Sequence, residues 1–107
     1  MSNSFSVALL SNVSAAGNGA AFGWTGGSGV ATFDGTFGGT SATLQYLGPS
    51  GTWLDVKALD PSTGTQTTVA LTAAGMIGFL LPPGQIRAVL TGGAPANVYA
   101  IAATTTL

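Results

Sequence analysis

Glycine and proline occur so often in this chain that they leave no room for a long regular helix. The 107 residues include 17 glycines and 5 prolines, and both residue types weaken or break helices. No stretch of about ten residues shows the i, i+3, i+4, i+7 apolar spacing of an amphipathic helix without such an interruption. We therefore expect negligible helix and a core built from short strands.

Apolar and polar residues alternate between the turns, which is the pattern of half-buried strands. In Thr52–Leu59, Leu54 and Val56 are expected to face inward, and Trp53, Asp55 and Lys57 outward. The preceding Gly-Pro-Ser-Gly sequence predicts a hairpin turn. Seven or eight strands are expected in all, and besides Thr52–Leu59 they include Ser4–Leu10, Val30–Phe33, Thr40–Leu47, Thr67–Thr72, Met76–Leu81, Gln85–Thr91 and Val98–Ala103.

Short strands separated by Gly- and Pro-rich turns about every 8–12 residues are typical of antiparallel sandwiches and jelly rolls. We therefore expect an all-β fold, a jelly-roll-like antiparallel β-sandwich that occupies residues 1–107 as a single domain. Gly26–Gly29 is expected to be a turn and Asp60–Gly64 a loop. Trp24, beside glycines, is expected to lie in the core or to plug a loop.

Charged side chains are rare. The sequence has no histidine, cysteine or glutamate, and its charged residues are Asp34, Asp55, Lys57, Asp60 and Arg87. General acid-base catalysis, activated nucleophiles and transition-metal sites draw mainly on residue types that are missing or scattered here. Asp34 before Gly35 and Asp60 before Pro61 are typical of turns. We expect no catalytic residue, no cofactor and no metal site.

The same inventory argues against two classes of partner. A net charge of −1 does not provide the basic surface that binds nucleic acid or anionic lipid. The apolar run Met76–Leu81 is much shorter than the roughly 20 residues that span a bilayer, and Met1–Leu10 does not have the features of a signal peptide. We expect neither nucleic acid nor a membrane as partner, and a chain made in the cytoplasm.

Low charge favours self-association. Only 5% of the residues are charged, against about 25% in ordinary domains. A neutral surface of Thr, Ser, Gly and Ala loses water at little cost, and identical copies meet without like-charge repulsion. We expect a homo-oligomer, most simply a trimer; the alternative is a neutral domain kept soluble by its hydroxyl groups.

The candidate contact residues are Trp53, Arg87, Asp55 and Tyr46. Trp53 and Arg87 lie at outward positions of their expected strands, and Trp and Arg are common in interface hot spots. Arg87 in so neutral a chain has to reach solvent, Asp55 across the sheet, or an acceptor on a neighbouring subunit. Trp53 and Tyr46 could instead form an aromatic groove for a sugar. The alternative is that these four side chains are packed internally or solvated and contact no partner.

Three phrases of the sequence resemble the small capsid decoration (cement) proteins of tailed bacteriophages. They are Phe33–Thr40 (FDGTFGGT), Leu44–Trp53 (LQYLGPSGTW) and Leu81–Ala88 (LPPGQIRA). The resemblance implies an all-β virion protein that binds the outside of a phage head and stabilises contacts between major capsid subunits, often as a trimer. It also implies synthesis in the bacterial host cytoplasm and a final location on the capsid surface.

Two other functional classes compete with this interpretation. One is a carbohydrate- or receptor-binding β module of a phage head or tail fibre, for which Trp53 and Tyr46 would be the binding residues. The other is an enzyme, which would have to work with aspartate alone.

Overall fold

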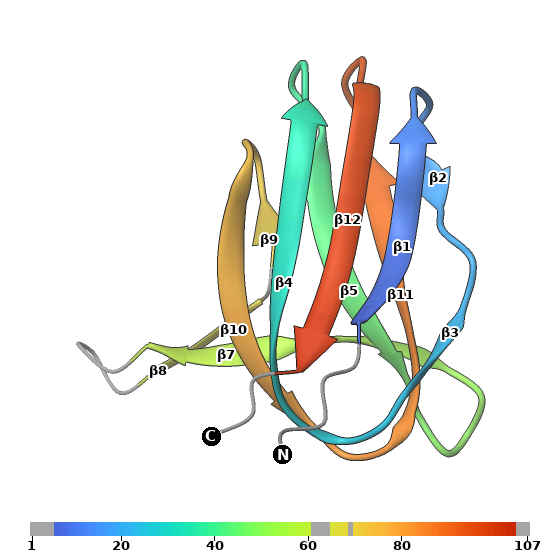
Figure 1. Ribbon diagram of the computed structural model, residues 1–107, viewed down its shortest axis with the longest axis vertical. Helices are drawn as coiled ribbons and strands as arrows, with labels where there is room; N and C mark the ends of the chain where they lie inside the picture. Colours follow the sequence, from blue (N-terminus) through green and yellow to red (C-terminus); the bar gives the residue numbers. More distant parts are fainter. Residues whose placement is uncertain (1–5, 61–64, 69, 105–107) are drawn as a thin grey trace.

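The computed structural model describes residues 6–60, 65–68 and 70–104. Within these ranges there is no helix, and two antiparallel sheets pack face to face as a sandwich (Figure 1). The expectation of an all-β sandwich is confirmed.

The strand order is that of a jelly roll. One sheet has the order β1-β12-β4-β10 and the other has β11 and β5 at its centre. Two strand positions of this second sheet are interrupted: β2 and β3 share one edge of β11, and β6 and β9 share one edge of β5. Counted this way, each sheet has four positions, in agreement with the upper end of the predicted strand number. The strands are β1 (Ser6–Val13), β2 (Gly17–Asn18), β3 (Phe22–Trp24), β4 (Gly27–Thr36), β5 (Ser41–Leu47), β6 (Trp53–Asp55), β9 (Ala70–Leu71), β10 (Gly75–Leu81), β11 (Gly84–Thr91) and β12 (Ala96–Thr104).

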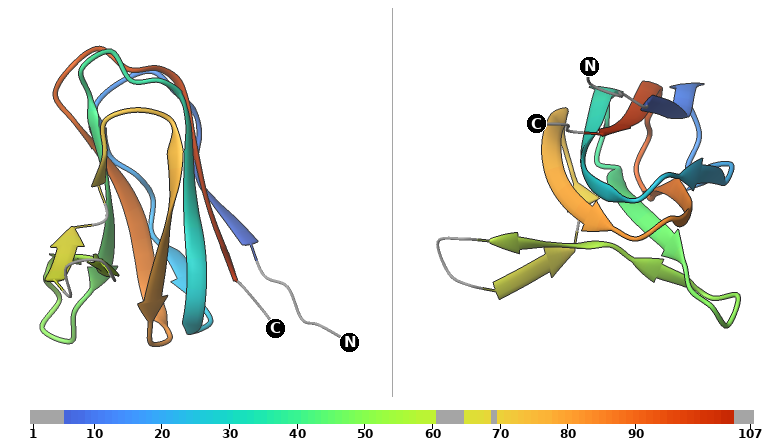
Figure 2. Two further views of the ribbon diagram at one scale, coloured as in Figure 1. Left: turned by 90° about the vertical axis from the view of Figure 1, so that its left-hand side faces the viewer. Right: turned by 60° about the horizontal axis from the view of Figure 1, so that its bottom comes forward.

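A two-stranded arm separates β6 from β9. It consists of β7 (Lys57–Asp60) and β8 (Thr65–Thr68), which pair with each other and with neither sheet. Figures 1 and 2 show the arm passing β10, which β7 contacts, and extending beyond the sandwich on that side. The loop expected at Asp60–Gly64 lies outside the described residues except for Asp60, which ends β7.

The arm corrects two strand predictions, because neither Thr52–Leu59 nor Thr67–Thr72 forms one continuous strand. Val56 still donates its N–H to the Leu44 carbonyl (2.9 Å), and its side chain is only 3% exposed. Beyond Val56 the edge of β5 is taken by β9, so the chain turns away and pairs locally with β8.

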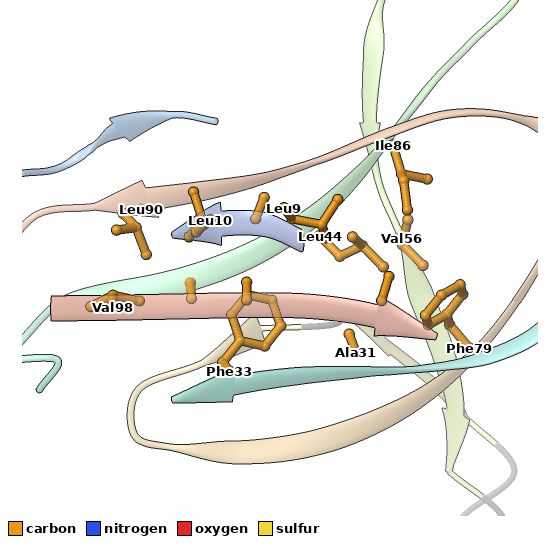
Figure 3. Close-up of a cluster of buried hydrophobic side chains, with 14 of the residues drawn as sticks. Leu9, Leu10, Ala31, Phe33, Leu44, Val56, Phe79, Ile86, Leu90 and Val98 are labelled. Carbon is orange, nitrogen blue, oxygen red and sulfur yellow. The ribbon is translucent and has the colours of Figure 1, made fainter. Parts of the chain in front are cut away.

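The core lies between the sheets (Figure 3). The predicted alternation holds in β11, where Ile86, Ala88 and Leu90 are buried, and in β5, where Ala42 and Leu44 are buried. Burying a side chain of Leu or Ile size stabilises the fold by about 1.5–3 kcal/mol. The opposite sheet contributes Ala31, Phe33, Phe79, Val98, Ala100 and Ala102.

Strand β1 departs from simple alternation. Leu9 and Leu10 are both buried, because the pairing with β12 shifts register between Ala8 and Leu10 and again before Val13. Such a bulge turns consecutive side chains to the same side. Alternation along Ser4–Leu10 predicts Phe5, Val7 and Leu9 on one face. Val7 and Leu9 do face the core, Leu10 joins them, and Phe5 lies outside the described residues.

The glycine run before Val30 is strand rather than turn. Gly27 to Gly29 extend β4 and pair with Leu81 to Phe79 of β10. Gly29 faces the core, where a Cβ atom would lie 2.5 Å from the Trp24 ring. Trp24 itself is 2% exposed, with its ring centroid 5.0 Å from that of Phe79, so its predicted core position is confirmed.

Candidate functional site

Four side chains form a row across the outer face of the sheet that contains β11 and β5. Gln45 of β5 is the register partner of Arg87 in β11 and of Asp55 in β6. Residues opposite each other in a sheet project to the same side, and so do residues two apart along a strand. Trp53 therefore lies on this face too. We call Trp53, Arg87, Gln45 and Asp55 the Trp53–Arg87 row.

The contacts along the row are specific. Arg87 Nε donates to Gln45 Oε1 (2.9 Å), and Gln45 Nε2 donates to Asp55 Oδ1 (2.9 Å). The guanidinium carbon of Arg87 lies 4.3 Å from the centroid of the Trp53 ring. Arginine only donates and a carboxylate only accepts, so one orientation of the Gln45 amide satisfies both neighbours. Two contacts thus hold the Arg87 guanidinium in place.

These contacts contribute little to folding stability. A cation–π contact near the surface is worth about 0.5–1 kcal/mol, and the Gln45–Asp55 hydrogen bond is exposed. Large hydrophobic cores supply the bulk of stability in a domain of this kind. What the row provides is a fixed aromatic and cationic surface beside an anion, and that is a binding property.

Tyr46 lies on the other face of the same sheet. Its register partners are Leu54 and Ile86, and Ile86 is a core residue. The Tyr46 hydroxyl donates to the Pro83 carbonyl (2.8 Å), and a Cβ atom at Gly84 would lie 2.5 Å from that hydroxyl. Tyr46 therefore supports the corner between β10 and β11, and it shares no groove with Trp53.

Alternation correctly predicted the outward positions of Trp53, Asp55 and Arg87, but the sequence analysis missed Gln45. The short Gly48–Gly51 turn fixes which residues of β5 and β6 face each other, so the Gln45–Asp55 pair could have been derived from it. The pairing of β5 with β11 joins distant parts of the chain, and no local signal gives its register. Leu54 was also expected to be inward, yet it is 51% exposed beside this turn.

The outer face of the β1-β12-β4-β10 sheet is different in character. Met76, Leu80, Tyr99 and Ile101 are exposed there, and we call them the apolar face. These four strands contain a single charged residue, Asp34, whose carboxylate accepts the Gly35 N–H (2.8 Å). The turn expected at Asp34 and Gly35 is wrong, because both residues belong to β4. Asp34 itself lies within β4 and pairs in register with Tyr99.

The described residues contain neither a metal-ion cluster nor a membrane-spanning helix. No three carboxylate, imidazole or thiol side chains gather there in a way that could hold a metal ion. No helix in this part of the chain is long and apolar enough to cross a membrane.

Comparison with known proteins shows the fold. No family model matches the chain, and no curated protein matches its sequence. The structure is similar to the SPBc2 prophage-derived protein YomS, with a TM-score of 0.72, 8% identity and coverage of 95% of this chain and 94% of YomS. It is also similar to the PBSX exported protein XepA, with a TM-score of 0.69, 18% identity and coverage of 95% of this chain but 38% of XepA.

A fainter likeness, to the capsid of the Helicobacter pylori bacteriophage KHP30, has a TM-score of 0.38 and 16% identity, which is too low to carry an argument. The chain is thus a jelly-roll β-sandwich whose fold is shared with a prophage-derived protein.

Proposed function

We propose that this chain is a structural phage protein that binds the outer surface of a head and stabilises contacts between major capsid subunits. The observation that supports this most directly is the Trp53–Arg87 row. The shared fold of the prophage-derived YomS supports a phage origin, and the resemblance to decoration proteins in three sequence phrases supports the head location.

The row has the properties of an attachment site. Trp and Arg dominate binding hot spots, and a guanidinium already held by Gln45 and Trp53 loses little conformational freedom on binding. Because a head offers many equivalent sites, weak attachment per copy still gives a firmly held layer. The role is mechanical and needs no catalysis.

The trimer implied by the resemblance belongs to the same proposal. A trimer would present three copies of the row to the shell at once, which raises the effective affinity. The partner would be the major capsid protein, and the mature location would be the surface of the virion.

One observation favours a second function, the binding of a glycan. Trp53 shares the outer face of the sheet with the planar polar groups of Gln45 and Asp55, and sugars bind to such combinations of stacking and hydrogen bonding. Arg87 covers one face of the ring, so a sugar would stack on the opposite face.

Co-sedimentation with phage heads that lack the protein tests the first proposal. Trp53→Ala and Arg87→Ala should each weaken attachment by about tenfold or more. Thr91→Ala is the control, because Thr91 is exposed on the same strand and the same face as Arg87. Attachment equal to that of the parent in both row variants would contradict the proposal, and retention of a glycan by the parent but not by Trp53→Ala would favour the second function.

A further inference from the structure

Strand β10 is an unusual sheet edge. The other edges that the structure describes are short or irregular: β2, β3, β6 and β9 have two or three residues each, and β1 carries two register shifts. In contrast, β10 has seven residues and pairs with β4 in unbroken register from Gly75–Phe33 to Leu81–Gly27. Within the described chain no strand pairs with its other side, and β7 of the arm lies near β10 without pairing with it.

Proteins usually protect a long edge strand with charges, prolines or bulges, because its unpaired N–H and C=O groups can bind another strand. None of these devices occurs in β10, whose sequence is GMIGFLL, with Pro82 placed just after its end. Met76 is 67% exposed and Leu80 is 74% exposed. Gly78 lies between them on the same outward face of the strand. This face is therefore apolar and has no side chain at its centre.

We propose that β10 pairs antiparallel with β10 of a second copy, about a two-fold axis at Gly78. This register sets Gly78 opposite Gly78 of the second copy, and Met76 opposite Leu80 of the second copy. The two β1-β12-β4-β10 sheets would then join into one continuous sheet, with the apolar faces of both copies side by side.

A second copy fits this edge better than a different partner does. A two-fold antiparallel pair needs a strand that is complementary to itself, and the Met76–Leu80 pair occurs twice in this register. The strand is uncharged, so identical strands meet without repulsion. A seven-residue edge is about 24 Å long and only one strand wide, so the interface is small. We therefore expect a weak association whose extent rises with protein concentration.

This inference does not depend on the proposed function. The Trp53–Arg87 row lies on the other sheet and stays accessible in the pair. Pairing through β10 therefore leaves a capsid-binding surface free, and it is also compatible with a trimer that uses other surfaces. In that case the assembly would contain an even number of copies.

Two double variants test the register by sedimentation over a range of concentrations. Met76→Glu/Leu80→Lys places opposite charges across the two-fold axis and should keep the pair, whereas Met76→Lys/Leu80→Lys places like charges there and should weaken it by about tenfold or more. Residues 76 and 80 are about 13 Å apart along the strand, so their charges interact mainly between copies. Equal association of the two variants would overturn the proposal.

Gly78 supplies an independent pair of variants. A Cβ atom there would have no neighbour closer than 3.8 Å, so either side chain fits the isolated chain. Gly78→Lys puts two ammonium groups together on the axis and should weaken association by about tenfold, and Gly78→Thr should leave it within about threefold. A parent chain that stays monomeric to millimolar concentration, or a trimer that none of these variants changes, would overturn the inference.

Discussion

The two outer faces of the sandwich are built on the same core but differ in chemistry. On the sheet of β11 and β5, three side chains with charged or amide groups form a fixed row beside Trp53. On the other sheet, the exposed large hydrophobic residues are Met76, Leu80, Tyr99 and Ile101. Alternation shows only that a position faces outward. Packing in the core does not restrict which residue occupies such a position, so its side chain can be one that suits binding.

The two proposals assign a different kind of partner to each region. An edge without charge, such as β10, suits a copy of itself, because no opposite charge has to be supplied. A guanidinium and a carboxylate held in fixed positions instead suit a surface whose own donors and acceptors match them. Of the described charged side chains, Arg87 and Asp55 belong to the row, Lys57 lies at the start of the arm, and Asp34 lies in β4 beside Tyr99.

The two tryptophans give the strongest test of this contrast between core and surface. Trp24→Ala should lower the free energy of unfolding by about 3–5 kcal/mol, because it removes a ring buried against Phe79. Trp53→Ala should cost less than about 1 kcal/mol, since it removes mainly a surface contact with Arg87. Urea unfolding measures both; similar losses would mean that Trp53 is part of the core and the row has no free surface.

Two glycines of the β4–β10 pair compare the inner and outer sides of one sheet. Gly29→Ala forces a Cβ atom to within 2.5 Å of Trp24 and 2.8 Å of the Ala103 carbonyl oxygen, and should cost about 1–3 kcal/mol. Gly78→Ala meets only an ordinary contact and should change stability by about 0.5 kcal/mol or less. Thermal unfolding distinguishes them, and an equal loss would show that the outer side of β10 is packed.

Local sequence patterns correctly predicted most of the fold. Alternation in Gln85–Thr91 correctly predicted that Ile86 faces inward and Arg87 outward. The Gly48–Gly51 turn correctly predicted that β5 pairs with the strand that follows it, β6. These features depend on residues that are close together in the sequence, so they can be predicted from it.

The misses all depend on distant contacts. The break after Val56 arises because β9 competes for the edge of β5, and the burial of Leu10 arises from the way β1 shifts against β12. Gly27 to Gly29 offered no side-chain pattern, and the Trp24 ring and the Ala103 carbonyl oxygen, which is distant in the sequence, explain the glycine at position 29. The candidate site followed the same rule: the outward positions and the Gln45–Asp55 pair were predictable from local sequence, and the register that joins Arg87 to Gln45 was not.

Tyr46 tests whether the corner between β10 and β11 is held from the inner side of the sheet. Tyr46→Phe keeps the ring over Gly84 and removes the hydrogen bond to the Pro83 carbonyl. The expected loss is about 1 kcal/mol, measured by urea unfolding, with capsid attachment and self-association unchanged. A loss of attachment without a loss of stability would instead place Tyr46 at the binding surface, as the sequence suggested.

A double-mutant cycle on Trp53 and Arg87 gives the smallest effect and the most direct view of the row. Trp53→Ala, Arg87→Ala and the double variant should show a coupling of about 0.5–1 kcal/mol in unfolding free energy, because the guanidinium lies on the ring. Gln45→Ala should reduce this coupling, since Gln45 orients the guanidinium through Nε. If the coupling is unchanged without Gln45, the ring alone positions Arg87, and the amide would then act only as a spacer between Arg87 and Asp55.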